Sequence, residues 1–413
     1  MYNHSVADVT LFFNYFVIFI TLYFEVFLLI SLLEKKQSLW NDEEEYTPPV
    51  TIVVPCYNEE KTIAGTLDSL LALDYPRDMM RIMVIDDGST DGSQNALLPY
   101  KENPMIEVYK KENGGKYTAL NFAIEKCTTP FIGCLDADSF VMPGALRRIV
   151  AEFKDPKTMA VTPSMVIHTP NTFIQKLQKS EYNYGNFTRK LLAQIGSLHV
   201  TPGPFSFFRT EVFDKVGGYR HAHNTEDMEM AMRLQKHGLK IANAEGALVY
   251  TVGPDTFKKL YKQRVRWVGG FIGNIIDYRH MVFNRKYGDL GLVVLPFTIF
   301  STTISIGFVL INLWRILHKV WEHIVRFQVV GFSLPKFGEI NWFFFNNSAF
   351  SMLAIFSIIL SVYLIHLGQK MATGKWTFSF EAIYFILLYG SLTPIWLVKA
   401  IYNNIIGKDA SWR

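Results

Sequence analysis

The sequence predicts an α/β domain with a largely parallel sheet, joined to helices that cross a membrane. Two observations lead to this fold class. Strand-like and helix-like segments alternate from residue 48 to about residue 250, as in proteins with parallel sheets. Four apolar runs approach or exceed the ~20 residues that a helix needs to cross a bilayer. They cover residues 11–33, 291–314, 343–365 and 382–398.

Composition excludes several other classes. The chain has 413 residues and a formal charge of only +4, so it lacks the basic field of a nucleic-acid-binding protein. Its three cysteines, Cys56, Cys127 and Cys134, show no metal-ligand spacing. Because their number is odd and all three fall among predicted strands, we expect reduced core residues in the cytosol and no disulfide framework.

The first apolar run predicts an N-terminal transmembrane helix within residues 1–34. It lacks the basic start and the small-residue cleavage site of a signal peptide. Lys35 and Lys36 follow it directly, so the positive-inside rule places residue 34 onward in the cytoplasm. Glu25 lies within this run, and we expect it to face other helices or a sugar-lined passage, because an ionisable group is costly in lipid. Residues 35–47 are then a linker with an acidic, solvated stretch.

The C-terminal region, residues 289–413, predicts about three further membrane helices. The segment "RILHKVWEHIVRF" (315–327) is basic and amphipathic, so we expect it at the cytoplasmic face or an interface. If all three runs cross, the final "GKDASWR" lies outside. A re-entrant run is the alternative, and the sequence leaves the side of the C-terminus open.

Between these regions the elements follow a regular order. Apolar, β-branched stretches predict strands at 48–57, 81–87, 106–110 and 131–138, and periodic stretches predict helices at 58–73, 90–98 and 114–126. Two longer amphipathic helices are expected at 172–196 and from 256 to about 280. They are either interfacial helices on the bilayer surface or ordinary domain helices.

Acidic pairs end two of the predicted strands. Asp86 and Asp87 end the second, and Asp136 and Asp138 end the fourth. Ligands bind at the carboxyl ends of strands in such sheets. Residues two apart on a strand face the same side, so Asp136 and Asp138 predict a site for a hard divalent cation that neutralises a diphosphate.

Two further motifs have both a functional and a structural interpretation. Thr225, Glu226 and Asp227 are either an ordinary helix start or a general base at a fixed helix terminus. Gln263, Arg266 and Trp267, in "QRVRW", suit phosphate binding by guanidinium and sugar packing on indole. Interfacial anchoring by arginine and tryptophan is the alternative.

Taken together, these motifs resemble the processive family 2 glycosyltransferases, the membrane-embedded synthases of cellulose, hyaluronan, chitin and poly-N-acetylglucosamine. The resemblance spans residues 48–270 by motif and the whole chain by layout. It rests on the order of "VPCYNEE", "IDDGSTDGS", "NGGKYTALN", "CLDADS", "NTEDMEM" and "QRVRW". It implies a Rossmann-like GT-A domain at 48–255, on the cytoplasmic side of the plasma membrane in a multi-pass protein, followed by an interfacial segment with the QxxRW motif at 256–288.

The resemblance also implies roles for individual residues. Asp227 is the catalytic base, and Asp138 coordinates the metal, Mg²⁺ or Mn²⁺. Gln263 and Arg266 reach the diphosphate, while Trp267 lies under the terminal acceptor sugar. The other substrate-binding positions are Tyr57, Glu59, Asp86, Lys116, Asp136 and Glu226, with Asp86 at the uracil and Lys116 near the uridine or its phosphates.

The implied reaction is inverting, processive polymerisation of a UDP-sugar, with export of a β-linked polysaccharide across the membrane. Size and layout are most similar to bacterial poly-β-1,6-N-acetylglucosamine synthases, which suggests UDP-N-acetylglucosamine as donor. Hyaluronan or β-glucan synthesis and non-processive transfer to a lipid acceptor are alternatives within enzymes. A channel with a nucleotide-sensing domain is the alternative outside them. The expected partners are the donor, the growing polysaccharide and the bilayer; a small accessory membrane subunit is compatible with the resemblance, and nucleic acid is not expected.

Overall fold

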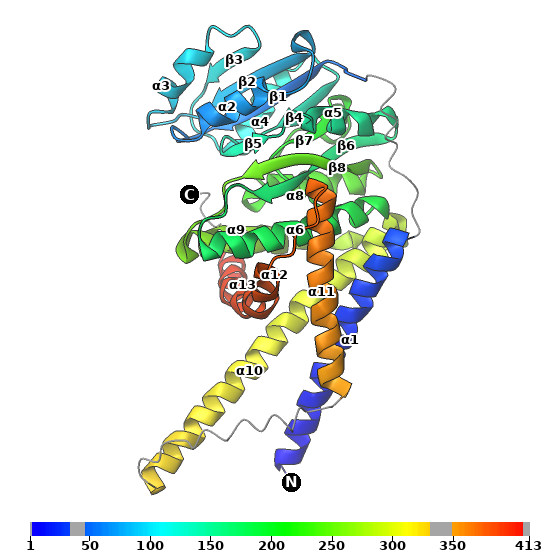
Figure 1. Cartoon of the computed structure of the whole chain (residues 1–413), viewed down its shortest axis with the longest axis vertical. Helices are drawn as coiled ribbons and strands as arrows, with labels where there is room; N and C mark the ends of the chain where they lie inside the picture. Colours follow the sequence, from blue (N-terminus) through cyan, green and yellow to red (C-terminus); the bar gives the residue numbers. More distant parts are fainter. Residues whose placement is uncertain (1, 34–45, 331–348, 408–413) are drawn as a thin grey trace.

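The computed structural model describes residues 2–33, 46–330 and 349–407. Most of the predicted linker 35–47, the lysines at 35 and 36, the start of the apolar run at 343 and the last six residues lie outside these ranges. Within them, an α/β domain is stacked on a layer of two long helices, and three further helices project away from it on the same side (Figure 1).

One mixed sheet of eight strands forms the centre of the domain, in the order β3-β2-β1-β4-β7-β6-β8-β5. The strands are β1 (Val50–Cys56), β2 (Met80–Asp86), β3 (Ile106–Lys110), β4 (Phe131–Cys134), β5 (Ser139–Val141), β6 (Thr158–Ile167), β7 (Ser206–Arg209) and β8 (Lys240–Thr251). The first four pair in parallel, as the sequence predicts. The second half is mixed, because β7 pairs antiparallel with both β4 and β6, and β5 pairs antiparallel with β8.

Helices cover both faces of the sheet, because successive strand residues are apolar and point to opposite faces. The helices of the domain are α2 (Ile63–Leu71), α3 (Ser93–Leu97), α4 (Lys116–Lys126), α5 (Ala145–Ala151), α7 (Glu211–Val216) and α8 (Glu226–Lys236). In β1, Val50, Ile52 and Val54 face a core formed with α2 and α5, whereas Val53 faces a second core with α4, α7 and α8. Cys56 and Cys134 are buried, Cys127 is half-buried, and all three are free thiols.

The two predicted amphipathic helices are confirmed as α6 (Phe173–Gln194) and α9 (Phe257–Asp277). Each begins at a threonine whose hydroxyl accepts a hydrogen bond from a first-turn amide. They lie side by side beneath the sheet (Figure 1). Helix α6 packs closely on α11 (Ala349–Thr373), where a Cβ on Gly368 would lie 1.9 Å from the carbonyl oxygen of Asn183. A location of these helices on a bilayer surface stays a prediction.

Two helices are long and apolar enough to cross a membrane among the described residues. They are Phe12–Leu32, within α1 (Tyr2–Leu33), and α11 (Ala349–Thr373). Glu25 is buried between them, and its carboxylate accepts hydrogen bonds from Ser357 and Ser361 of α11. The prediction that Glu25 faces other helices is therefore confirmed.

The last apolar run does not form one straight helix. It comprises α12 (Glu381–Tyr384), the π-helical turn η9 (Phe385–Tyr389) and α13 (Gly390–Ile405), with a bend of 46°. This pair is either a broken span or a re-entrant segment, which was one of the predicted alternatives. It packs beneath α9, close to the α/β domain (Figure 1).

The amphipathic segment 315–327 is part of a longer helix. It is the continuation of α10 (Leu295–Val330), a helix of 36 residues that carries it away from the α/β domain (Figure 1). Its expected location at the cytoplasmic face or an interface stays a prediction. No proline lies between residues 297 and 330, so no proline ends the helix where its polarity changes.

Candidate active site

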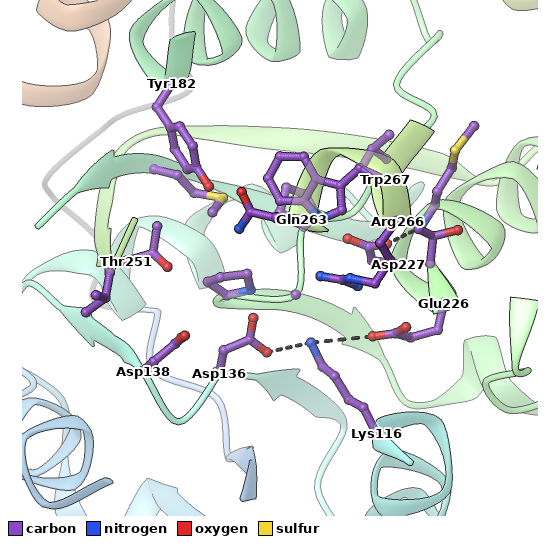
Figure 2. Close-up of a pocket in the computed structure, with 18 of the residues that line it drawn as sticks. Lys116, Asp136, Asp138, Tyr182, Glu226, Asp227, Thr251, Gln263, Arg266 and Trp267 are labelled. Atoms are coloured by element: carbon purple, nitrogen blue, oxygen red, sulfur yellow. Dashed lines mark hydrogen bonds and ion pairs between the residues drawn. The ribbon is translucent and has the colours of Figure 1, made fainter. Parts of the chain in front are cut away.

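A cavity of about 500 Å³ lies between the carboxyl ends of the central strands and the two helices α6 and α9. Its lining brings together residues from nine separate segments of the chain, and Figure 2 shows many of them. Ten of the eleven predicted site residues line it: Tyr57, Glu59, Lys116, Asp136, Asp138, Glu226, Asp227, Gln263, Arg266 and Trp267.

Asp86 is the predicted residue that does not line this cavity. It is buried at the end of β2, where its carboxylate accepts hydrogen bonds from the backbone of Ser89 and the amide of Gln94. Its neighbour Asp87 is connected to the cavity through the loop that precedes Lys116. Asp87 accepts bonds from the amides of Gly114 and Gly115, at 3.1 and 2.8 Å, and so fixes the loop that begins α4.

Lys116, the first residue of α4, joins two walls of the cavity. Its ammonium lies 2.5 Å from a carboxylate oxygen of Asp136 and 3.5 Å from one of Glu226 (Figure 2). Burial alone would lower the pKa of Lys116, but the two carboxylates outweigh it and raise that pKa well above its ordinary value. Lys116 therefore stays charged and is suited to bind an anionic group.

Gly203 makes this arrangement possible. A Cβ at this position would lie 2.5 Å from the Lys116 nitrogen and 3.0 Å from an oxygen of Asp136. Any larger residue would occupy the space in which the ion pair forms. Gly203 could not be predicted from the sequence, since nothing local distinguishes it from a glycine in an ordinary turn.

Asp136 and Asp138 lie differently from the prediction. Strand β4 ends at Cys134, so both aspartates belong to the connection to β5 and the same-face argument for strand residues does not apply. Both nevertheless line the cavity (Figure 2). No cluster of three or more His, Cys, Asp or Glu side chains forms a metal site within the described ranges. Asp138 thus fits a hard cation only if a ligand supplies most of the oxygen atoms.

Asp227 lies in the first turn of α8. Its side chain accepts a hydrogen bond from the amide of Met228 at 2.8 Å, and its backbone carbonyl accepts one from the Thr201 hydroxyl. Burial raises the pKa of the Asp227 carboxyl to about 6, and Glu226 adds to the rise, whereas Lys116 and Arg266 oppose it. A carboxyl with a pKa near neutrality in a cavity is suited to accept a proton.

Residues 225–227 do begin a helix, but without the side-chain cap of an ordinary helix start. Thr225 occupies the cap position, but its side chain caps no amide; it donates to the carbonyl of Ala222 and accepts from Asn274 of α9. The residues before it, 222–224, all have positive φ. Backbone strain is often found at functional sites, so this segment favours the functional interpretation of residues 225–227.

Helix α9 carries the QxxRW residues on the face toward the cavity (Figure 2). Arg266 donates to the carbonyl of Asn224 at 2.9 Å, which ties α9 to the strained segment. The side-chain oxygen of Gln263 is buried without a hydrogen-bond partner among the described residues, so a substrate donor would satisfy it.

Trp267 is held by a network that the sequence analysis missed. The guanidinium of Arg264 lies 4.2 Å from the centre of the Trp267 ring. Arg264 pairs with Glu181 of α6 at 2.5 Å and donates to the hydroxyl of Tyr389 at 2.7 Å. Tyr389 in turn donates to Glu181. The bent C-terminal pair therefore supports the indole from behind the cavity wall.

Comparisons with known proteins identify the family of the chain and agree with its fold. The profile of "Glycosyltransferase like family 2" matches residues 48–270, more than half of the chain. The chain therefore belongs to glycosyltransferase family 2, and the resemblance found in its motifs is confirmed.

Individual proteins with similar sequences include two bacterial polysaccharide synthases. The chain is 32% identical over 268 residues to a poly-β-1,6-N-acetyl-D-glucosamine synthase of Staphylococcus aureus (strain COL), covering 64% of this chain and 63% of that protein. It is 30% identical over 262 residues to the enzyme of the same name from Staphylococcus epidermidis, covering 63% of each. The chain thus matches less than two thirds of the length of these relatives.

Among solved structures, the chain resembles the mannosyltransferase PcManGT from Pyrobaculum calidifontis, determined in complex with GDP-Man and Mn²⁺. The TM-score is 0.66 at 18% identity, covering 98% of this chain and 99% of that one. At this identity the likeness establishes the fold, a GT-A domain with its helical attachments.

Proposed function

We propose that the protein is a membrane-embedded, processive, inverting glycosyltransferase that polymerises N-acetylglucosamine from UDP-N-acetylglucosamine into a β-linked polysaccharide and exports it. The observation that carries this proposal is the position of Asp227. A half-buried carboxyl with a raised pKa shares one cavity with the cationic Lys116 and Arg266 and with an indole, Trp267. The choice of sugar rests on the relatives, which are named poly-β-1,6-N-acetyl-D-glucosamine synthases.

In the proposed mechanism, Asp227 accepts the proton of an acceptor hydroxyl. The acceptor oxygen then attacks the anomeric carbon of the donor from the face opposite UDP, which inverts the configuration. Lys116 and Arg266 hold the diphosphate and stabilise its charge as the bond to the sugar breaks. Trp267 provides the flat surface on which the terminal acceptor sugar packs.

A divalent cation, Mg²⁺ or Mn²⁺, completes the proposal. Asp138 would hold it together with the diphosphate, and the bound cation would neutralise the departing UDP. Asp138 qualifies because its carboxylate lines the cavity beside Asp136, and hard divalent cations prefer carboxylate oxygen.

The bilayer, a growing glycan and a cytoplasmic location of the α/β domain belong to the same proposal. The helices α1 and α11 both leave the domain on the side of α6 and α9, which form the cavity wall (Figure 1). An elongating chain that packs on Trp267 would therefore already lie on the side from which these helices project.

The test uses the purified full-length chain and a panel of UDP-sugars. We expect UDP release and polymer formation with UDP-N-acetylglucosamine, and a product that a β-1,6-specific N-acetylglucosaminidase degrades. Polymer formed only from another UDP-sugar would contradict the sugar assignment. A product of a single added sugar on a lipid would contradict processivity.

A further inference from the structure

The wall that α6 contributes to the cavity has a cationic group whose role the proposed reaction leaves open. Tyr182, Gly185 and Arg189 line the cavity at spacings of three and four residues, so they share one face of the helix. Gly185 leaves room for Arg189 to lie along this face, since a Cβ on Gly185 would be 3.2 Å from an Arg189 nitrogen.

Arg189 is held in place from one side only. Asn186 donates to the carbonyl of Met165 and accepts from its amide, both at 2.8 Å, so β6 fixes the side-chain amide of Asn186. The same amide oxygen accepts from Arg189 at 2.5 Å. One nitrogen of the guanidinium is therefore anchored to the fold, and the group is prevented from turning into solvent.

This guanidinium is not paired with a carboxylate among the described residues. Its Nε is buried without a hydrogen-bond partner, and no carboxylate lies within 4.0 Å of it among the residues that the structure places. Lys116 and Arg264, by contrast, are each paired with carboxylates. Burial lowers the pKa of Arg189 to about 10, so it is charged at neutral pH. A partly desolvated guanidinium with an unpartnered Nε is unfavourable until a ligand supplies an oxygen atom.

We infer that Arg189 forms a subsite for an oxygen-bearing substituent of the acceptor glycan, an amide carbonyl or a carboxylate. This inference rests on the proposed function. If UDP occupies the half of the cavity near Tyr57, Lys116 and Asp138, the α6 wall faces the acceptor. A guanidinium there donates hydrogen bonds to an N-acetyl carbonyl or a carboxylate, and repels the ammonium of a de-N-acetylated sugar.

The experiment measures acceptor selectivity at saturating UDP-N-acetylglucosamine, as UDP release against acceptor concentration. Three oligosaccharides of equal length serve as probes: one of N-acetylglucosamine, the same chain fully de-N-acetylated and protonated, and one that contains glucuronate. The variants are Arg189→Met and Arg189→Glu in the full chain. Lys190→Met is the matched control, because Lys190 is the next residue of α6 but pairs with Glu245 away from the cavity. UDP binding monitors folding.

We expect wild-type kcat/KM to favour the N-acetylated over the de-N-acetylated probe by about tenfold or more, the scale set by pairing of a buried polar group. Arg189→Met should remove this preference, Arg189→Glu should reverse it, and Lys190→Met should preserve it. Preference for the glucuronate probe would show that Arg189 binds a carboxylate oxygen of the acceptor, and preference for the N-acetylated probe would show that it binds a carbonyl oxygen.

Unchanged selectivity in variants that bind UDP normally would overturn the inference about Arg189 and leave the proposed function standing. Absence of transfer by the wild type to every probe would overturn the proposed function as well.

Discussion

Arg264 lies against Trp267, with its guanidinium carbon 4.2 Å from the centre of the indole ring. The arginine is buried, and Glu181 and Tyr389 bind it from α6 and from the bent C-terminal pair. One face of the indole is therefore occupied by a fixed cation. This leaves the opposite face for a sugar ring, and it makes the position of the indole depend on residues far away in the sequence.

Replacing Tyr389 by Phe tests this dependence. The change keeps the ring but removes the hydroxyl that accepts from Arg264 and donates to Glu181. We expect polymer synthesis to fall by about tenfold, the scale of one hydrogen bond to a charged group, while UDP binding is preserved. The measurement compares polymer yield with UDP affinity. Tyr384→Phe, a half-exposed tyrosine of α12, is the control, and an equal loss in both variants would contradict a specific role for Tyr389.

Trp267 itself distinguishes an acceptor platform from a membrane anchor. Trp267→Ala should leave membrane insertion and UDP binding near normal but stop elongation, because the acceptor loses its packing surface. Trp267→Tyr should retain partial synthesis at most, whereas a membrane anchor would tolerate tyrosine. Polymer length measured on correctly inserted protein decides between them. Full-length polymer from Trp267→Ala at the wild-type rate would eliminate the acceptor role.

The raised pKa of Asp227 predicts a pH profile. Below about pH 6 the carboxyl is protonated and cannot accept the acceptor's proton, so kcat/KM should rise with pH through this value. Glu226→Gln removes a neighbouring negative charge that contributes to the raised pKa, so the midpoint should move to lower pH. The profiles are measured with the donor at low concentration. An identical midpoint in the two proteins would show that another group controls the acid limb.

Asp138→Ala should abolish the part of UDP affinity that depends on Mn²⁺ or Mg²⁺ and leave the fold intact. Titration of UDP in the presence of cation and in the presence of a chelator measures this part directly. Asp78→Ala, which removes an exposed carboxylate of the same domain, is the control and should behave as wild type. Unchanged cation-dependent affinity in Asp138→Ala would remove Asp138 from the metal site.

The sequence predicted the part of the fold in which local pattern and burial agree. Each of the first four strands is a short apolar run followed by a turn, and their parallel pairing is as expected. The second half of the sheet was not predicted, because β7 inserts between β4 and β6 and pairs antiparallel with both. Such an insertion depends on tertiary packing and leaves no periodicity in the sequence.

In the candidate site, too, some residues could be predicted from local sequence motifs and others could not. Residues in short motifs, such as Asp227 and Trp267, were found because each motif places several polar groups together. Arg264 and Tyr389 are 125 positions apart, and Asn186 meets Met165 across 21, so their contacts appear only once the chain is folded. Asp138 was identified for the right cavity but with a wrong local reason, since it lies in a turn rather than on a strand.

The central claim is that Asp227 accepts the acceptor's proton, and Asp227→Asn tests it most directly because it preserves the shape of the side chain. The measurement is the initial rate of UDP release from UDP-N-acetylglucosamine during polymer synthesis, with UDP affinity determined on the same preparation. The account predicts near-normal UDP affinity and a turnover lower by about 10²–10⁴-fold, the usual contribution of a general base. Near-normal turnover of Asp227→Asn would contradict the account and leave residues 225–227 as the start of a helix.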